Sequence, residues 1–375
     1  MIKKFFVALI TLIIAAVSVC LAAALLLTLL FGTGVQTTRT QKVPVNMAIG
    51  DRFQMFTTNQ ISAALEGVLD VKKVYWLSDD DLIAPEPDQS KFGSAKDPGT
   101  LQWLLEDAQP LLDGQTTLFT TETPLVPGTE VTYYLDDTIF VVTWKQPFND
   151  SVYTISEVKI ADPSQFRRFL AGGSYGSGIQ LKTSEMAQSV NAVVASGGDF
   201  YAFRKMGVIV YDGVVQRTNA QRVDTCYIDD KGDLLFSYRG ELTDLEEAQK
   251  FVDDNNIRFS VAFGPVMIDN GQMISAGSYP LGQLKDNYAR AALCQMGQLH
   301  YLMVTAGLEG YYQETPNLRS FQKVLHSFGC EKAYNLDGGQ TAVIVMNDKV
   351  INRVVSYAER NVSDILYFAT AIPSH

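Results

Sequence analysis

The pattern of hydrophobic and polar positions divides this chain into three parts. An uncharged apolar run comes first, a mixed region with some helical spacing follows, and short strand-like runs dominate from Val131 onward. The expected strands are Val131–Tyr134, Thr138–Trp144, Val152–Ile160, Ala192–Ala195, Gly207–Tyr211, Leu234–Tyr238, Arg258–Phe263, Leu299–Ala306, Ala333–Leu336, Thr341–Met346 and Ile365–Ala369. Helices are expected at Thr183–Val190, Leu242–Asp253 and Pro316–Phe328. Many strands with few helices favour an α+β domain, a mixed β-sheet with a few packed helices, over a doubly wound fold.

The N-terminal run has the length of a membrane anchor. It extends from Phe5 to Phe31 without a charge, which as a helix is roughly 40 Å long and exceeds a hydrocarbon core of about 30 Å. The apolar part of a cleaved signal peptide is usually only about 7–15 residues long, so we favour an uncleaved transmembrane helix. Lys3 and Lys4 precede the run, which predicts a cytoplasmic N-terminus and an extracellular C-terminal domain in a single-pass cell-membrane protein.

The remaining chain is expected to contain a smaller membrane-proximal region and a larger domain. Asp51 is placed to cap a helix that runs to about Leu69, and the spacing around Leu101–Ala108 predicts another helix, limited by Pro110. Short segments with a strand-like pattern begin at Val131. We therefore expect an anchor at 1–35, a membrane-proximal region at 36–130 and a domain at 131–375.

Charge and cysteine content exclude several kinds of function. The net charge is −11 and no long run of Lys or Arg occurs, which argues against a nucleic-acid partner. Cys226, Cys294 and Cys330 lack metal-type spacing, so buried free thiols are favoured, although one bridge among them stays open. The three histidines form no metal triad, so no metal or other cofactor is expected; the spacing does not indicate a structural cation either, although the acidic loops leave room for one.

The sharpest local feature is the stretch Tyr334-Asn335-Leu336-Asp337-Gly338-Gly339-Gln340-Thr341. A buried-looking strand ends in polar residues, and two glycines follow before a second apolar strand. Glycines allow positive φ and let a ligand or another backbone approach closely. The alternative interpretation is an ordinary Asp-Gly hairpin turn.

Other segments supply the context for this stretch. They are Val194–Tyr201, Gly207–Gly213, Phe263–Pro265, Asn287–Arg290 and Phe328–Cys330 upstream, and Asn352, Arg360 and Ser363–Tyr367 downstream. In this order they resemble the phosphodiester glycosidase family, also called the uncovering-enzyme family, over about residues 131–370. Gly197, Tyr288, Ala291 and Gln340 depart from the usual family residues.

The resemblance implies a set of site residues. Cleaving a sugar from a phosphodiester develops positive charge on the sugar ring, so Asp337 and Asp199 are the candidate catalytic carboxylates. Arg suits the phosphate because its planar fork can bind two oxygens. The candidate substrate-binding residues are Arg290, Arg360, Arg204, Asn335, Gly338, Gly339, Gln340, Thr341, Tyr201 and Asn352. Asn335 and Asn352 have the alternative role of satisfying turn backbone, and Phe200 is expected in the core.

The expected function is hydrolysis of glycosyl phosphodiesters in cell-surface polysaccharide or cell-wall polymers, with release of the sugar. The expected partners are thus a carbohydrate phosphodiester and, through the N-terminal helix, the membrane. A non-catalytic glycan-binding or exopolysaccharide-assembly protein on the same fold is the alternative. A purely structural envelope protein is a third interpretation.

Overall fold

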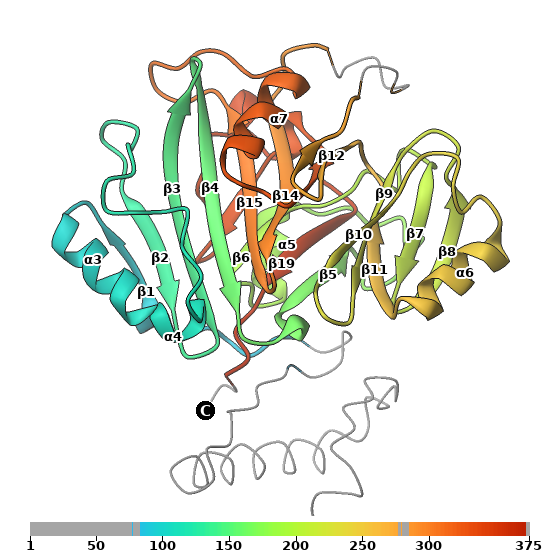
Figure 1. The fold of residues 1–375 in the computed structure, drawn as a ribbon, viewed down its shortest axis with the longest axis horizontal. Coiled ribbons are helices and arrows are strands. Elements are labelled where there is room, and N and C mark those ends of the chain that lie inside the picture. The colour runs from blue at the N-terminus through green and yellow to red at the C-terminus, as the bar shows by residue number, and fades with distance from the viewer. Residues whose placement is uncertain (1–76, 78–82, 277–278, 280–284, 373–375) are drawn as a thin grey trace, which may run out of the picture. The chain divides into compact units, whose positions relative to one another are not determined.

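The computed structural model describes residues 77, 83–276, 279 and 285–372 (Figure 1). The expected transmembrane run Phe5–Phe31 and the expected helix that starts near Asp51 lie outside these residues. Within the described ranges no helix is long and apolar enough to cross a membrane. Tyr75–His375 forms one compact unit.

Three sheets make up the described chain, and every strand pair in them is antiparallel. The large sheet has the order β1 (Phe92–Ala95), β2 (Val131–Leu135), β3 (Ile139–Phe148), β4 (Ser151–Ile160), β15 (His300–Gly307), β14 (Arg290–Gly297), β16 (Lys332–Leu336), β12 (Val266–Asp269), β13 (Gln272–Met273). The β6 sheet has the order β18 (Lys349–Val350), β17 (Ile344–Met346), β6 (Val194–Gly197), β19 (Asp364–Phe368), β5 (Phe166–Leu170). The β7 sheet has the order β10 (Leu234–Ser237), β9 (Thr225–Asp229), β11 (Ile257–Val261), β7 (Gly207–Tyr211), β8 (Val214–Asn219).

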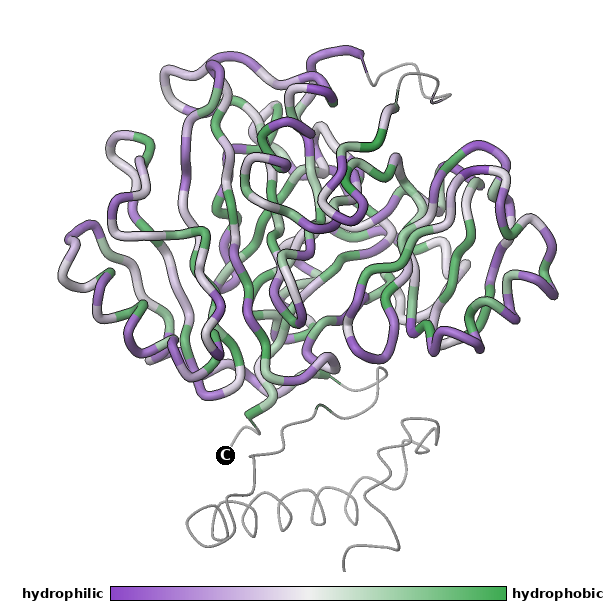
Figure 2. Tube along the Cα trace, in the orientation of Figure 1, coloured by the Kyte–Doolittle hydropathy of each residue, from purple (hydrophilic) through white to green (hydrophobic). Residues whose placement is uncertain are grey.

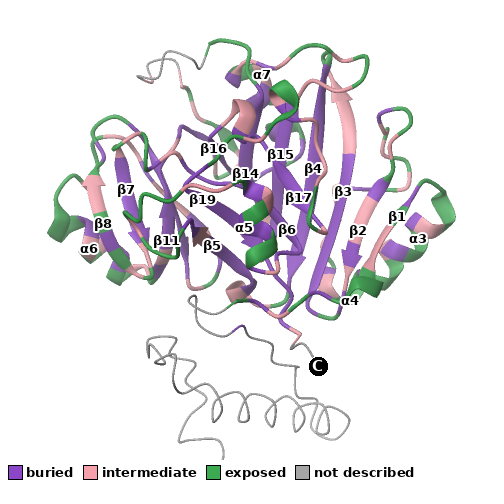
Figure 3. Ribbon diagram, turned by 180° about the vertical axis from the view of Figure 1, so that it is seen from behind, coloured by how far each residue is buried: buried purple, intermediate pink, exposed green. Residues whose placement is uncertain are grey.

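Helices cover the outer faces of these sheets. One face of the large sheet packs against α3 (Pro98–Asp107), α4 (Gln109–Leu112) and α7 (Leu318–Ser327), and its other face packs against both smaller sheets. The outer face of the β6 sheet is covered by α5 (Thr183–Ser189), and that of the β7 sheet by α6 (Leu245–Asp254). Hydrophobic residues follow the strands in Figure 2, and exposed residues collect on the helices and loops in Figure 3. The prediction of a sheet-dominated α+β domain with few helices is confirmed.

Residues 84–130 share a sheet and a core with the rest of this unit. Strand β1 pairs with β2, and Leu104 of α3 is fully buried against the large sheet. The buried Glu157 carboxylate accepts hydrogen bonds from the backbone N–H groups of Leu118 (2.9 Å) and Phe119 (3.0 Å). The domain boundary expected at residue 131 would therefore separate β1 from β2, its hydrogen-bonded partner. Pro110 does not simply end a helix, because it lies in the first turn of α4, where proline is tolerated.

Candidate active site

Asp337 lies where the chain crosses from one sheet to another. Strand β16 belongs to the large sheet and β17 to the β6 sheet, and the short helical turn η5 (Gly339–Thr341) lies between them. The stretch is therefore a sheet-to-sheet crossing, and the hairpin interpretation is wrong. A Cβ atom at Gly338 would lie 2.4 Å from the carbonyl oxygen of Ala289, so this close approach requires glycine.

Asp337 forms an ion pair with Arg360. The Nη2 atom of Arg360 donates to Oδ2 of Asp337 at 2.6 Å, and the two side chains are 40% and 11% exposed. The N–H of Gly338 donates to Oδ1 at 3.0 Å. Burial raises the pKa of Asp337 above its ordinary value, and the positive charge of Arg360 is the strongest opposing influence. A carboxyl group with a raised pKa beside a partly exposed arginine is a typical arrangement for acid–base chemistry.

Aromatic rings flank the Arg360 guanidinium. Its central carbon lies 5.0 Å from the ring centroid of Phe200, and Phe200 stacks on Phe203 with centroids 4.6 Å apart. Tyr201, in contrast, is buried between the ring of Tyr175 (5.3 Å) and the guanidinium of Arg168 (5.4 Å). The structure thus exchanges the expected positions: Phe200 lies at the site, and Tyr201 lies in the interior.

Arg204 and Asn335 both bind the segment that precedes β12. Arg204 Nη2 donates to the Phe263 carbonyl at 2.6 Å, and Asn335 Nδ2 donates to the Gly264 carbonyl at 2.8 Å. The positive charge of Arg204 also lowers the pKa of Asp337. Each side chain keeps one buried atom without a hydrogen-bond partner among the described residues, Nε of Arg204 and Oδ1 of Asn335. Buried polar atoms are normally paired, so these two atoms are exceptions that a buried water molecule would satisfy.

Asp199 belongs to a fully buried cluster. Its Oδ2 accepts from the N–H of Ala262 at 2.6 Å and lies 3.6 Å from Nη2 of Arg168. Arg168 Nε donates to Asp364 Oδ2 at 2.8 Å, and Asp364 Oδ1 accepts from the N–H of Asp199 at 3.1 Å. Burial raises the pKa of Asp364, and Arg168 opposes that shift. Asp199 is joined to Asp337 through the backbone, since the N–H of Asp337 donates to the Gly198 carbonyl at 3.4 Å.

Sequence reasoning gave no role to Arg168 and Asp364. A signal was present in Phe166–Leu170, where two arginines stand between apolar residues. An arginine side chain that points into a hydrophobic core must pair with a carboxylate, because an unpaired buried charge costs several kcal/mol of stability. The two adjacent charges also obscure the strand pattern of this segment, which is β5 in the structure.

Arg290 and Asn352 are held by backbone groups. Arg290 donates to the carbonyls of Asp286 (2.7 Å) and Pro316 (3.4 Å), and burial lowers its pKa to about 10. Asn352 accepts from the N–H of Ile344 and donates to the Ala342 carbonyl, both at 2.8 Å. Of the two roles left open for Asn352, these contacts match the satisfying of turn backbone.

The turn after Asp337 is closed by its own side chains. Thr341 Oγ1 donates to the Gly338 carbonyl at 2.8 Å, and Gln340 Nε2 donates to the Ala358 carbonyl at 3.4 Å. The N–H of Gly339 donates to the Ala289 carbonyl at 2.8 Å. These bonds position Asp337. No group of three or more His, Cys, Asp or Glu side chains suited to a metal ion occurs in the described part of the chain.

Comparison with known proteins points to one family. Residues 188–369 match the family model described as phosphodiester glycosidase. Among solved structures, a hypothetical protein from Synechocystis has 13% identity and a TM-score of 0.51, with 66% of this chain and 64% of that chain covered. This chain thus covers less than two thirds of that protein, and the likeness shows the fold alone.

A second solved structure is the zebrafish N-acetylglucosamine-1-phosphodiester α-N-acetylglucosaminidase catalytic domain, auto-inhibited by its pro-peptide. It has 17% identity and a TM-score of 0.49, with 70% of this chain and 93% of that chain covered. No curated protein matches the chain.

Proposed function

Residues 188–369 match the phosphodiester glycosidase family model, and from this match we propose that the chain hydrolyses glycosyl phosphodiesters between the anomeric carbon and the phosphate oxygen. The observation that carries the proposal is the ion pair of Asp337, a largely buried carboxyl group with a raised pKa, with the partly exposed Arg360. Arg360 binds it directly, and Arg204 is close enough to lower its pKa.

The proposed reaction uses these groups as follows. A water oxygen forms the new bond to the anomeric carbon as the bond from that carbon to the phosphate oxygen breaks. The leaving phosphate takes the bonding electron pair, and Asp337 takes the proton of the attacking water. The ionised carboxylate also stabilises the positive charge that develops on the sugar ring. Asp199 is a positioning residue in this scheme, because its carboxylate faces Arg168 and Ala262.

The two arginines are suited to hold the phosphate. Arg360 uses Nη2 for Asp337 and is 40% exposed, so its other donors are free to reach a second acceptor. Arg204 is half-buried, and of its donors only Nη2 binds an acceptor among the described residues, the Phe263 carbonyl. A phosphodiester bound by both would be stabilised most when it leaves with full negative charge, which favours the transition state over the bound substrate.

The substrate proposal extends to surface polymers. If Phe5–Phe31 forms the anchor expected from the sequence, the domain faces the outside of the cell, where polysaccharides and wall polymers contain such linkages. The membrane topology, the extracellular location and the polymer substrate stand together as one proposal.

The test is release of free sugar from a small soluble sugar-1-phosphodiester by the full chain. The first assay substrate is methyl-phosphoryl N-acetylglucosamine, chosen from the chemistry that names the zebrafish enzyme. Sugar release by the wild type and its loss in Asp337→Asn support the proposal. Binding of the glycan without release by the wild type would favour the non-catalytic alternative, a glycan-binding or assembly protein.

A further inference from the structure

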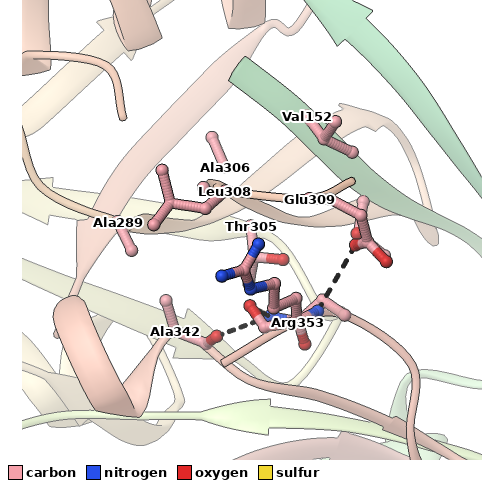
Figure 4. A pocket seen from close by; sticks show the side chains of 11 residues that line it. Val152, Ala289, Thr305, Ala306, Leu308, Glu309, Ala342 and Arg353 are labelled. Carbon is pink, nitrogen blue, oxygen red and sulfur yellow. Dashed lines mark hydrogen bonds between the residues drawn. The ribbon is translucent and has the colours of Figure 1, made fainter. Parts of the chain in front are cut away.

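A small pocket lies at the end of β15 (Figure 4). It is bounded by Ala289, Ala342, Asn352, Arg353, and residues of β4 and β15 with the loop that follows β15. Its enclosed space is about 10 Å³, which is room for about one water molecule, and the 220 Å³ around it that is free of protein atoms includes open solvent. Two wall residues bind the Asp337 turn, since the Ala289 carbonyl accepts from Gly339 N–H (2.8 Å) and Ala342 N–H donates to the Gly339 carbonyl (3.2 Å). The pocket and the candidate active site therefore share a wall.

Arg353 supplies a positive charge to this pocket. Figure 4 shows its side chain extending into the pocket beside Thr305. Its guanidinium carbon lies 4.6 Å from the ring centroid of Tyr357. No oxygen atom of the described residues accepts a hydrogen bond from this guanidinium. Five N–H donors are therefore open to a ligand.

The neighbouring carboxylate does not neutralise Arg353. Glu309 Oε1 lies 2.6 Å from Nζ of Lys145, and its Oε2 accepts only the backbone N–H of Arg353, at 3.4 Å. Glu309 and Lys145 thus form a pair of their own. One positive charge remains in the pocket, and a planar guanidinium favours a phosphate or carboxylate group.

The segment from Arg353 to Arg360 connects the two sites. The N–H of Arg360 donates to the Gln340 carbonyl at 3.3 Å, so the segment packs on the turn that follows Asp337. Between the two arginines, Ser356 and Tyr357 have φ of 61° and 57°. Non-glycine residues rarely adopt this left-handed conformation, and such strain is often retained at binding sites. This backbone conformation holds the ring of Tyr357 over the Arg353 guanidinium. Tyr357 itself is 79% exposed.

We propose that the Arg353 pocket is a second phosphate subsite, which binds the phosphate next to the scissile one in a polymer with repeating sugar-1-phosphodiester linkages. This inference rests on the proposed function and gives its substrate class as a polymer. Arg353 binds the neighbouring phosphate at the open mouth of the pocket, and the exposed face of Tyr357 is available to the sugar between the two phosphates.

The experiment compares two synthetic substrates on the full chain. One is methyl-phosphoryl N-acetylglucosamine, with one phosphodiester, and the other contains two such repeats and two phosphodiesters. The ratio of kcat/KM for the two-phosphate substrate over the one-phosphate substrate is measured in the wild type, Arg353→Gln, Arg353→Lys and Lys250→Gln. Lys250 is an exposed residue of α6 and controls for loss of one charge.

We expect Arg353→Gln to lower this ratio roughly tenfold, as for one charged hydrogen-bonded contact, and Arg353→Lys to lower it less. The ratio in Lys250→Gln should equal that of the wild type. An unchanged ratio in Arg353→Gln would overturn the subsite. If the wild type released sugar from neither substrate, the proposed function would fail, and calorimetry with the two-phosphate compound would still decide the subsite: equal affinity for wild type and Arg353→Gln would refute it.

Discussion

This chain contains two aspartate–arginine ion pairs with similar distances between their charged groups, and the two pairs differ in their exposure to water. Asp337 and Arg360 are 2.6 Å apart with side chains 11% and 40% exposed. Asp364 and Arg168 are 2.8 Å apart, and both side chains are 0% exposed. Similar geometry thus serves two purposes. The buried pair is shielded from a ligand, whereas in the partly exposed pair the remaining donors of Arg360 are open to a substrate.

The partners of each pair support the same distinction. Arg168 also donates to the Ser260 carbonyl and faces Asp199, so it joins strands β5, β11 and β19 with the end of β6. Arg360 has the rings of Phe200 and Phe203 beside it and solvent on its remaining side. We therefore expect substitutions at the first pair to change stability and substitutions at the second pair to change activity.

The largest effect is expected from Asp337→Asn. Sugar release should fall about 100- to 1,000-fold, the range found when one charge-stabilising group is lost. Stability should not fall. A raised pKa means that the ionised carboxylate costs stability at pH values above that pKa, and the neutral amide removes this cost. Steady-state kinetics and thermal unfolding check both parts, with Asp254→Asn on α6 as the control; near-normal turnover in Asp337→Asn would contradict the role of Asp337.

The next effect is expected from Arg168→Met. It leaves Asp364 and Asp199 buried without their cation, which should cost about 3–5 kcal/mol of unfolding free energy. The matched variant Arg360→Met breaks the pair whose arginine is 40% exposed, and because water reaches this pair it should cost less, about 1 kcal/mol. Urea unfolding measures both. Equal losses in the two variants would break the distinction between the pairs.

A smaller effect is expected from Arg360→Lys. The charge remains but the planar fork is lost, so binding of two phosphate oxygens at once is weakened. We expect kcat/KM for a sugar-1-phosphodiester to fall roughly tenfold, with a rise in KM as well as a fall in kcat. Kinetics with wild-type parameters for Arg360→Lys would show that Arg360 does not hold the phosphate.

The smallest effect is a shift in the pH profile. If Asp337 must be ionised, kcat/KM should rise with pH through an apparent pKa above the ordinary aspartate value of about 3.9. Arg360→Gln removes the cation that opposes this shift, so its apparent pKa should move further upward. Measuring the rising part of the profile of kcat/KM against pH in the wild type and in Arg360→Gln tests this prediction. A downward move would contradict the assignment of Asp337 to that part of the profile.

Local patterns predicted many of the elements. The helix expected at Pro316–Phe328 is observed as α7 at Leu318–Ser327, and Asn317 caps it by accepting from Ser320 N–H at 2.9 Å. Strand β14 was not expected, although it lies between β15 and β16 in the large sheet. Its alanine content gives a weak strand signal, and only tertiary pairing makes it a strand.

The candidate site was predictable in part. The order of motifs identified Asp337 and Arg360, which lie 23 positions apart and meet at 2.6 Å. It did not separate Asp199 from Asp337, because both follow a strand and adjoin glycines. They differ in their partners: Asp199 faces the fully buried Arg168 of β5, and Asp337 pairs with the partly exposed Arg360. Such a contact between distant segments is not encoded in either motif.

The most direct test of the central claim follows the oxygen of water. The full chain is incubated with a sugar-1-phosphodiester in water enriched in ¹⁸O, and both products are analysed by mass spectrometry. Cleavage at the anomeric carbon predicts ¹⁸O in the released sugar and unlabelled phosphate, after correction for exchange at the sugar's anomeric hydroxyl. Label in the phosphate would show attack at phosphorus and contradict assignment of this chain as a glycosidase.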